Sequence, residues 1–214
     1  MKRRYFGQIA ASLAVAMAAF AAPVAFAADE APDALVRRLS DDVLASIKAD
    51  KSIQSGDVTK IIALVDSKIM PNVNFQRMTA SAVGPAWRQA TPEQQKRLQD
   101  EFKILLVRTY SGALAQVSND QAITVKPLRA GAADADVMVR TEVRGKGEPI
   151  QLDYRLEKTP GQGSGWKIYN LNVLGVWLVE TYRSQFAQEI NAKGVEGLIT
   201  TLSTRNQSNA GKKS

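Results

Sequence analysis

The 214-residue sequence contains neither cysteine nor histidine. Without cysteine, the chain can form no disulfide, use no thiol nucleophile and bind no metal through thiolates. Without histidine, it lacks the side chain that most often serves as a general base at neutral pH and that most often ligates transition metals. We therefore predict no catalytic residue, no metal ligand and no enzymatic activity.

The remaining motifs do not restore a catalytic site. The two glycines of RGKGE (residues 144–148) join two predicted strands and do not open a helix, so they form no phosphate-binding loop. Ser40 and Ser111 have no histidine to activate them. Asp153 and Glu142 alternate with other residues along predicted strands, which is typical of a solvated ladder of charges. No cofactor is expected.

Long apolar runs are also scarce, and the single one lies at the N-terminus. Three basic residues at positions 2–4 precede an alanine-rich apolar run over residues 9–22, and Ala25 and Ala27 lie at −3 and −1 of a cleavage point. This pattern predicts a secretory signal peptide over residues 1–27. The alternative, an uncleaved anchor, has a run that is short for a membrane span. We expect an exported protein that starts near residue 28.

The chain has a mild excess of positive charge. The formal charge of +7 falls to +4 when the three basic residues of the predicted signal peptide are removed. Because the remaining basic residues are scattered, we predict no nucleic-acid partner. A mild excess of this kind suits anionic membrane surfaces or acidic partner proteins.

The first half of the mature sequence has the 3.6-residue apolar period of amphipathic helices. The best-defined start is at Thr91, the expected cap, with Pro92 at the first helical position and Gln94 completing a capping box. The predicted helices cover residues 33–50, 57–71, 74–84 and 91–118, then restart at about residue 177 and again at residue 195 after Gly194.

After Asn119 the apolar period changes to two, which is typical of half-buried strands. Short connections rich in Gly, Pro or Asp favour an antiparallel meander with one apolar and one charged face. On the last strand, Ile168 lies on the side of Asn170 and Asn172, which indicates that both faces of this strand are partly covered. The predicted strands cover residues 121–128, 135–144, 148–158 and 165–176.

This order of elements predicts a single α+β domain over residues 28–203. We expect a four-stranded, curved antiparallel sheet with several helices packed on one face, enclosing an apolar cavity. The polar segment 204–214 has no aromatic residue and is predicted to be a disordered tail.

The apolar residues of the helices and the sheet face suit either a packed core or a cavity for an apolar ligand. The sequence alone does not separate the two. Tyrosines favour a cavity, because a phenol offers an apolar wall and a polar tip. The candidate residues of a lipid-binding cavity are Phe75, Met78, Trp87, Phe102, Leu106, Tyr110, Val139, Leu152, Tyr154, Leu171, Leu178, Tyr182 and Phe186.

Trp177 does not fit the apolar face of its predicted helix. Leu178, Tyr182 and Phe186 recur every four positions, and Trp177 lies nearly opposite to them. One hypothesis places its ring at the mouth of the cavity or on a rim that faces a partner or membrane, together with Arg183. The other begins the helix after Trp177 and leaves the ring free to pack into the core.

Two long segments resemble the pattern of the MlaC family, also called the toluene-tolerance family. They are PNVNFQRMTASAVGPAWRQATPEQQKRLQDEFKILLVRTYSGAL (residues 71–114) and WKIYNLNVLGVWLVETYRSQF (residues 166–186), and the match covers nearly all of the mature chain. Positions that match the family motif are Phe75, Gly84, Trp87, Phe102, Tyr110, Val176, Leu178, Tyr182, Arg183 and Phe186. This sequence departs from the family at Trp177, Leu174 and Asn170, where members often have Ser, an acidic residue and Asp.

The resemblance implies a periplasmic phospholipid carrier of Gram-negative bacteria that holds lipid tails between its sheet and its helices. Such a protein exchanges lipid with an outer-membrane lipoprotein–porin complex and with the substrate-binding subunit of an inner-membrane ABC transporter. That exchange maintains outer-membrane lipid asymmetry. Other hypotheses are a carrier of another amphiphile such as a hopanoid, a cone-shaped α+β enzyme, and a structural periplasmic adaptor with a solid core.

Overall fold

The computed structural model describes residues 30–129, 131 and 134–210. The predicted signal peptide and residues 211–214 lie outside this part of the chain. The helical elements before the sheet are α1 (Pro32–Ala49), α2 (Lys51–Gln54), α3 (Val58–Leu64), the π-helical turn η1 (Val65–Ile69), the 3-10 turn η2 (Met70–Asn72), α4 (Phe75–Val83), the 3-10 turn η3 (Gly84–Arg88) and α5 (Pro92–Ala115). The sheet consists of β1 (Ala122–Val125), β2 (Asp136–Arg144), β3 (Ile150–Lys158), β4 (Trp166–Val173) and β5 (Val176–Trp177), and α6 (Leu178–Ala210) follows it.

The α+β class and the antiparallel meander are confirmed, but the sheet has five strands in the order β1-β2-β3-β4-β5. The predicted count of four is wrong because the segment 165–176 contains a reversal. Leu174 and Gly175 both have positive φ values, 51° and 86°. Such residues form a two-residue hairpin turn, which folds β5 back onto β4.

A bulge in β4 changes which of its side chains share a face: Arg155 pairs with Asn170 and the next residue, Leu156, pairs with Ile168, so Tyr169 is the extra residue. The register shifts between Arg155 and Leu156. Ile168 therefore lies opposite Leu156, while Leu171 lies opposite Tyr154, and both belong to the apolar face. The prediction that placed Ile168 with the asparagines of this strand is wrong, because strict alternation does not allow for a bulge.

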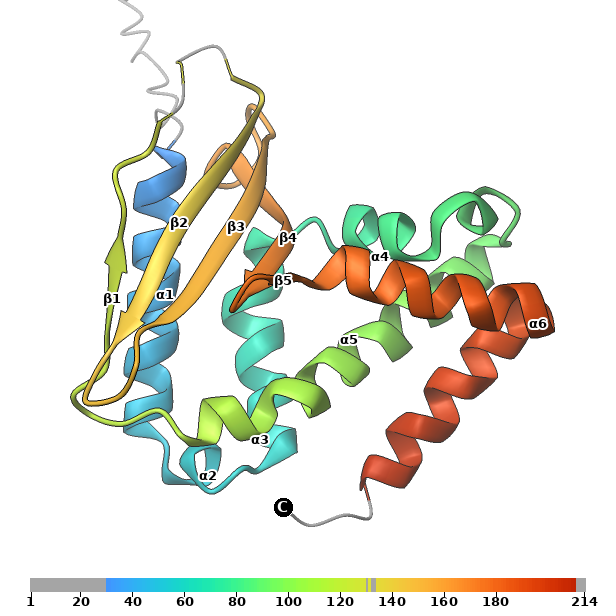
Figure 1. The fold of residues 1–214 in the computed structure, drawn as a ribbon, viewed down its shortest axis with the longest axis horizontal. Helices are drawn as coiled ribbons and strands as arrows, with labels where there is room; N and C mark the ends of the chain where they lie inside the picture. Colours follow the sequence, from blue (N-terminus) through green and yellow to red (C-terminus); the bar gives the residue numbers. More distant parts are fainter. Residues whose placement is uncertain (1–29, 130, 132–133, 211–214) are drawn as a thin grey trace, which may run out of the picture.

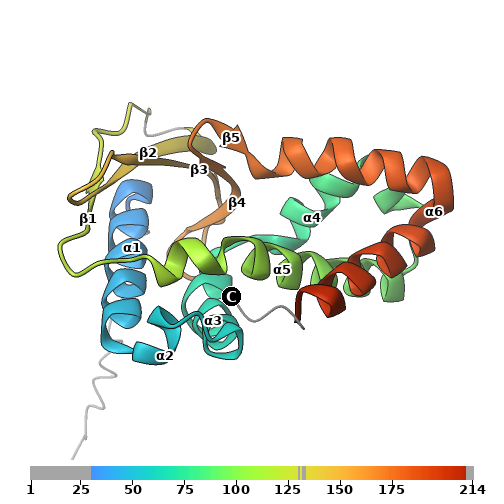
Figure 2. The ribbon, with the colours of Figure 1, turned by 60° about the horizontal axis from the view of Figure 1, so that its bottom comes forward.

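The apolar face of the sheet packs against α1, which lies along it in Figures 1 and 2. We call this the sheet cluster. A second group, the helix cluster, joins α4, α5 and α6 beside the sheet. Its buried members are Phe75, Met78, Ala82, Val83, Leu98, Phe102, Leu105, Leu178, Val179, Tyr182, Phe186, Leu198, Ile199 and Leu202. The sheet cluster contains Leu35, Val36, Leu39, Val125, Val137, Val139, Leu156, Trp166 and Ile168.

The predicted start of the long central helix is confirmed at α5. The Thr91 hydroxyl accepts a hydrogen bond from the backbone N–H of Gln94 (3.2 Å), and the side-chain oxygen of Gln94 accepts one from the backbone N–H of Thr91 (3.1 Å). These two bonds satisfy donors that the first turn of a helix leaves free. The cap fixes the position at which α5 enters the helix cluster.

Helix α6 consists of two arms that meet at Gly194, which has φ 69° and ψ −176°. This backbone conformation is open essentially to glycine alone. The second arm continues to Ala210, so the predicted disordered tail is wrong for residues 204–210. Asn206 attaches this part of the helix to α5: its buried side-chain amide donates to the backbone carbonyl oxygen (2.9 Å) and to the carboxylate (2.7 Å) of Glu101.

Leu174 gives the first prediction, since a leucine with positive φ is strained and this one is 64% exposed. We expect Leu174→Asn to raise the free energy of unfolding by about 0.5–1 kcal/mol, because asparagine tolerates the left-handed conformation of this turn. Urea unfolding measures the change. Leu174→Ser is the control: it removes the same side chain without this tolerance, and an equal gain in both variants would contradict the backbone explanation.

Candidate functional site

The helix cluster is centred on a group of aromatic rings. Phe102 of α5 is fully buried, and its ring centroid lies 5.7 Å from that of Phe75, 5.0 Å from that of Tyr182 and 5.2 Å from that of Phe186. The contacts with Tyr182 and Phe186 are edge-to-face, a favourable arrangement for aromatic pairs. This centre is packed and does not leave an open space around Phe102.

The predicted cavity is therefore not confirmed as one open space surrounded by all the candidate residues. Phe75, Met78, Phe102, Leu178, Tyr182 and Phe186 are buried in the helix cluster, and Trp87, Leu106, Tyr110 and Leu171 are half-buried at its margin. Val139 and Tyr154 pack in the sheet cluster instead, and Leu152 is half-buried on β3 opposite Val173. A period-2 pattern identifies the apolar face of a strand but not the helix that covers each part of it.

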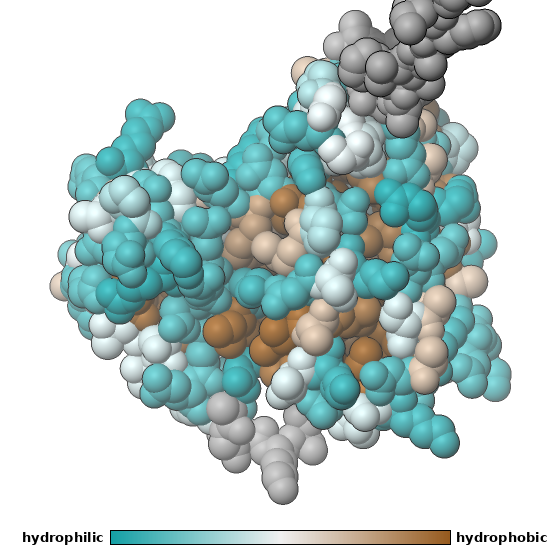
Figure 3. Space-filling model, turned by 180° about the vertical axis from the view of Figure 1, so that it is seen from behind, coloured by the Kyte–Doolittle hydropathy of each residue, from teal (hydrophilic) through white to brown (hydrophobic). Residues whose placement is uncertain are grey.

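The half-buried residues at the margin of the helix cluster are the best candidates for contact with a ligand. Leu106 and Tyr110 come from α5, and Leu171 and Val173 come from β4. Burial and the neighbouring Tyr182 raise the pKa of Tyr110, so its phenol is neutral at neutral pH. Figure 3 shows apolar residues exposed in the middle of one face of the molecule, between hydrophilic flanks.

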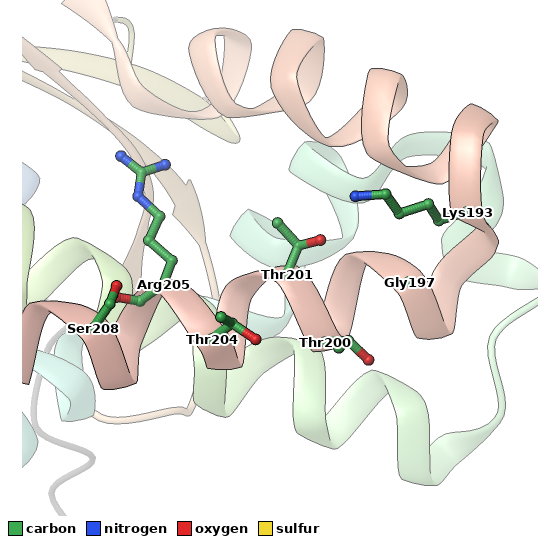
Figure 4. A pocket seen from close by; sticks show the side chains of 7 residues that line it. All are labelled: Lys193, Gly197, Thr200, Thr201, Thr204, Arg205 and Ser208. Atoms are coloured by element: carbon green, nitrogen blue, oxygen red, sulfur yellow. The ribbon is translucent and has the colours of Figure 1, made fainter.

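A hollow of about 480 Å³ lies against the C-terminal arm of α6. Figure 4 shows Lys193 at the end of the first arm and Arg205 on the second. The remaining lining residues are Gly197, Thr200, Thr201, Thr204 and Ser208. Because no aromatic or large aliphatic side chain lines it, this hollow is not the apolar cavity that the sequence predicts.

Trp177 lies in β5, on the polar side of the sheet. The guanidinium carbon of Arg155 is 4.0 Å from the centroid of the indole, and Arg155 also donates to the Glu180 carboxylate (2.7 Å). Because α6 begins at Leu178, the helix does start after Trp177, as one hypothesis expects. The half-buried ring nevertheless contacts a cation on the polar face and is not part of the core.

Asn170 is a structural residue whose importance the sequence pattern did not indicate. Its side chain is 1% exposed, and its oxygen accepts hydrogen bonds from the N–H groups of Leu171 (2.9 Å) and Val179 (3.2 Å). Its amide donates to the Glu180 carboxylate (2.8 Å). Because Val179 lies in the first turn of α6, Asn170 caps this helix from the neighbouring strand. Asparagine is disfavoured within strands, and its position in the middle of β4 was the available signal.

Burial disfavours the charged form of Glu180, but other contacts outweigh it. Hydrogen bonds from Asn170 and from the Glu180 backbone, together with Arg155, hold the pKa of this carboxyl below its ordinary value. Asp153 on the same face is buried, unlike Glu180, and its carboxylate accepts from the Gln151 amide (2.7 Å). The predicted solvated ladder is therefore wrong at Asp153, which is 5% exposed and lies opposite the buried Asn172 of β4.

Over residues 30–129, 131 and 134–210, no group of three or more Asp and Glu residues is arranged to hold a metal ion. None of the helices in the same ranges is long and apolar enough to cross a membrane. What the site offers is a margin of half-buried apolar side chains that includes the phenol of Tyr110, which is suited to binding an amphiphile.

Comparison with known proteins identifies relatives of the whole domain. The toluene tolerance protein ttg2D of Pseudomonas putida is 31% identical over 185 residues, which cover 85% of this chain and 82% of that protein. The intermembrane phospholipid transport system binding protein MlaC of Haemophilus influenzae is 25% identical over 178 residues, which cover 82% of each chain.

A solved structure extends the comparison to the fold. The phospholipid-binding protein of Ralstonia solanacearum, solved in complex with a phospholipid, is 51% identical and superposes with a TM-score of 0.79 over 83% of this chain and 98% of that one. Each of these relatives is named for binding, transport or tolerance, and none for an enzymatic activity. The model of the MlaC protein family matches residues 37–204, and this chain belongs to the MlaC family.

Proposed function

We propose that this protein binds phospholipid and carries it through the periplasm. It would receive and deliver lipid at two membrane complexes: an outer-membrane lipoprotein–porin complex and the substrate-binding subunit of an inner-membrane ABC transporter. This exchange would maintain the lipid asymmetry of the outer membrane. Support comes from the 51% identical relative that was solved with a phospholipid and from the relative named for intermembrane phospholipid transport.

The observation that carries the proposal is the apolar margin of the helix cluster. Leu106, Tyr110 and Leu171 are half-buried there, although each packs against the buried cluster. A methylene group loses about 0.8 kcal/mol when it leaves an apolar environment for water, so an acyl chain needs such a surface to cross an aqueous compartment. We propose that the chains lie on this margin and displace side chains of the helix cluster when they enter.

Two features of the helix cluster would allow lipid to enter and leave. Its α6 wall contains the break at Gly194, so the two arms are separate helical segments. Its centre consists of rings in pairwise contact, which can separate without breaking a polar network. A carrier must release its cargo, and apolar contacts between rings can form again once the lipid has left.

Native mass spectrometry and lipid extraction of protein purified from the periplasm test the proposal. We expect a stoichiometric phospholipid on the wild type and its loss in Leu106→Trp, which fills the margin. Leu128→Trp is the matched control, since Leu128 is half-buried in the sheet cluster on the other side of the fold. A wild-type protein that is empty would refute the proposal, and a hopanoid mass would assign the carrier to another amphiphile.

A further inference from the structure

A surface hollow of about 630 Å³ lies where α4, η3 and α6 meet. Three of its nine lining residues are arginines, Arg77, Arg88 and Arg183, and none is acidic. Its volume is within the range of small-molecule sites. The three arginines come from different elements, so the fold gathers them and the sequence does not show them as a cluster.

The three arginines differ in how far their charges are compensated. Arg77 pairs with Glu157 and with Asp136 (3.4 Å), and its guanidinium carbon lies 3.5 Å from the centroid of the Tyr169 ring. Arg88 and Arg183 are exposed, and their side chains form no ion pair or hydrogen bond with any residue in the described part of the chain. The hollow therefore has one fixed guanidinium and two whose positive charges are free for a ligand.

Gly84 explains how Arg183 reaches the hollow. It ends α4 and begins η3 with φ 72° and ψ −144°, a conformation that L side chains rarely adopt. A Cβ atom at this position would lie 3.7 Å from Nε of Arg183, so the Arg183 side chain, which extends from α6, passes close to this turn. The turn leads to Trp87 and Arg88, which line the same hollow.

Trp87 connects the hollow to the apolar interior. Its half-buried side chain packs against the helix cluster and also lines the hollow. An indole with one side on a core and one side toward a polar hollow is suited to the boundary between the chains and the headgroup of an amphiphile. The hollow can therefore hold a charged group while the attached chain follows the indole toward the helix cluster.

We propose that this hollow binds the phosphate group of a lipid, with Arg88 and Arg183 as its ligands and Trp87 in contact with the start of the chains. Guanidinium groups bind phosphate oxygens through paired, charge-assisted hydrogen bonds. Arg77 is the positioned third cation, held in place by Glu157 and Asp136. The assignment rests on the proposed function and specifies where the polar part of the lipid lies.

Isothermal titration of the mature protein, stripped of bound lipid, tests the assignment. The probes are dihexanoyl phosphatidylglycerol as a monomer, dihexanoylglycerol, which has the same chains without phosphate, and glycerol phosphate, which has the phosphate without chains. The variants are Arg88→Gln with Arg183→Gln combined, and Arg37→Gln as the control, since Arg37 is an exposed arginine of α1 outside the hollow.

We expect the double variant to bind the phosphatidylglycerol at least about tenfold more weakly than wild type. The control should bind as wild type does, and dihexanoylglycerol should bind all three proteins equally. Equal affinity of wild type and double variant for the phosphatidylglycerol would overturn the assignment and leave the proposed function intact. Glycerol phosphate binding as tightly as the lipid would make the ligand a soluble phosphate ester. A wild type that binds no phosphatidylglycerol would refute the proposed function itself.

Discussion

Phe102→Ala is expected to lower the free energy of unfolding by about 3–5 kcal/mol, the usual cost of truncating a buried phenylalanine. Phe102 is fully buried on α5, and its ring contacts those of Phe75, Tyr182 and Phe186. Truncation would remove three aromatic contacts at once and leave a void that α4 and both arms of α6 would have to close. For a domain of this size the midpoint of thermal unfolding should fall by about 10 °C.

The same variant decides whether Phe102 belongs to a core or to the wall of a cavity. A ring that faced an open space would lose few contacts on truncation, because no protein atoms surround its outer side. A loss below about 1 kcal/mol in lipid-free protein would therefore show that the helix cluster is open in solution. Phe102→Leu is the control, since it keeps most of the buried volume and should cost clearly less than Phe102→Ala. Denaturant unfolding of both variants, with and without bound phospholipid, provides the comparison.

The parts of the fold that could be predicted are those set by neighbouring residues. The α5 start at Thr91 depends on two hydrogen bonds within four residues, and both are present. The β-strands follow from alternation, and the break in α6 follows from Gly194. Each signal acts over a few positions and survives whatever tertiary contacts form around it.

The parts that could not be predicted depend on residues far apart in the chain. Val139 and Phe102 were expected to line one cavity, but they pack in different clusters, because α1 covers the sheet at Val139. The bulge at Tyr169 in β4 places Ile168 on the apolar face, and no local sequence signal indicates it. Residues 204–210 have a polar composition and nevertheless stay helical, since Asn206 is held by Glu101 on α5. The polar composition of residues 204–210 therefore led to a predicted α6 that was too short. The apolar pattern led to a predicted cavity with too many lining residues.

The sequence indicates which apolar residues could meet a ligand, but it does not indicate the polar residues proposed for the same ligand. Leu106, Tyr110 and Leu171 were expected to line a cavity, and each is half-buried and packs against the helix cluster. Arg183 was expected on a rim, but the sequence gives no reason to pair it with Arg88, which is 95 residues away. Convergence of charges from α4, η3 and α6 is a property of packing, and only the structure brings these residues to one hollow.

Asn170→Ala is expected to destabilise the protein by about 2–3 kcal/mol, although the side chain touches no ligand in the proposed site. The substitution leaves the Val179 N–H at the start of α6 without its acceptor and removes the amide that Glu180 accepts from. Buried polar groups that lose their partners carry the full desolvation penalty. Urea unfolding at neutral pH measures the loss, and a change below about 0.5 kcal/mol would show that water replaces the asparagine.

Asn170→Asp separates the acceptor from the donor of this side chain. The aspartate keeps the oxygen that Val179 donates to, but it replaces the amide that lies 2.8 Å from the Glu180 carboxylate with a second acid.

In the wild type, the pKa of Glu180 lies below its ordinary value, so the contribution of Glu180 to stability is present at neutral pH and is lost as the pH falls. In Asn170→Asp, two carboxyl groups must share one proton, which raises the pKa of one of them in the folded state. That contribution is present in acid and is lost as the pH rises. Unfolding measured from about pH 2 to about pH 8 should therefore show opposite slopes from this site in the two proteins, the wild-type loss falling below the ordinary pKa of a glutamate. Asn170→Ala, which has no charge at this position, should lack the loss at rising pH. Parallel curves for the two proteins would mean that position 170 and Glu180 do not interact in solution, and that α6 is capped without them.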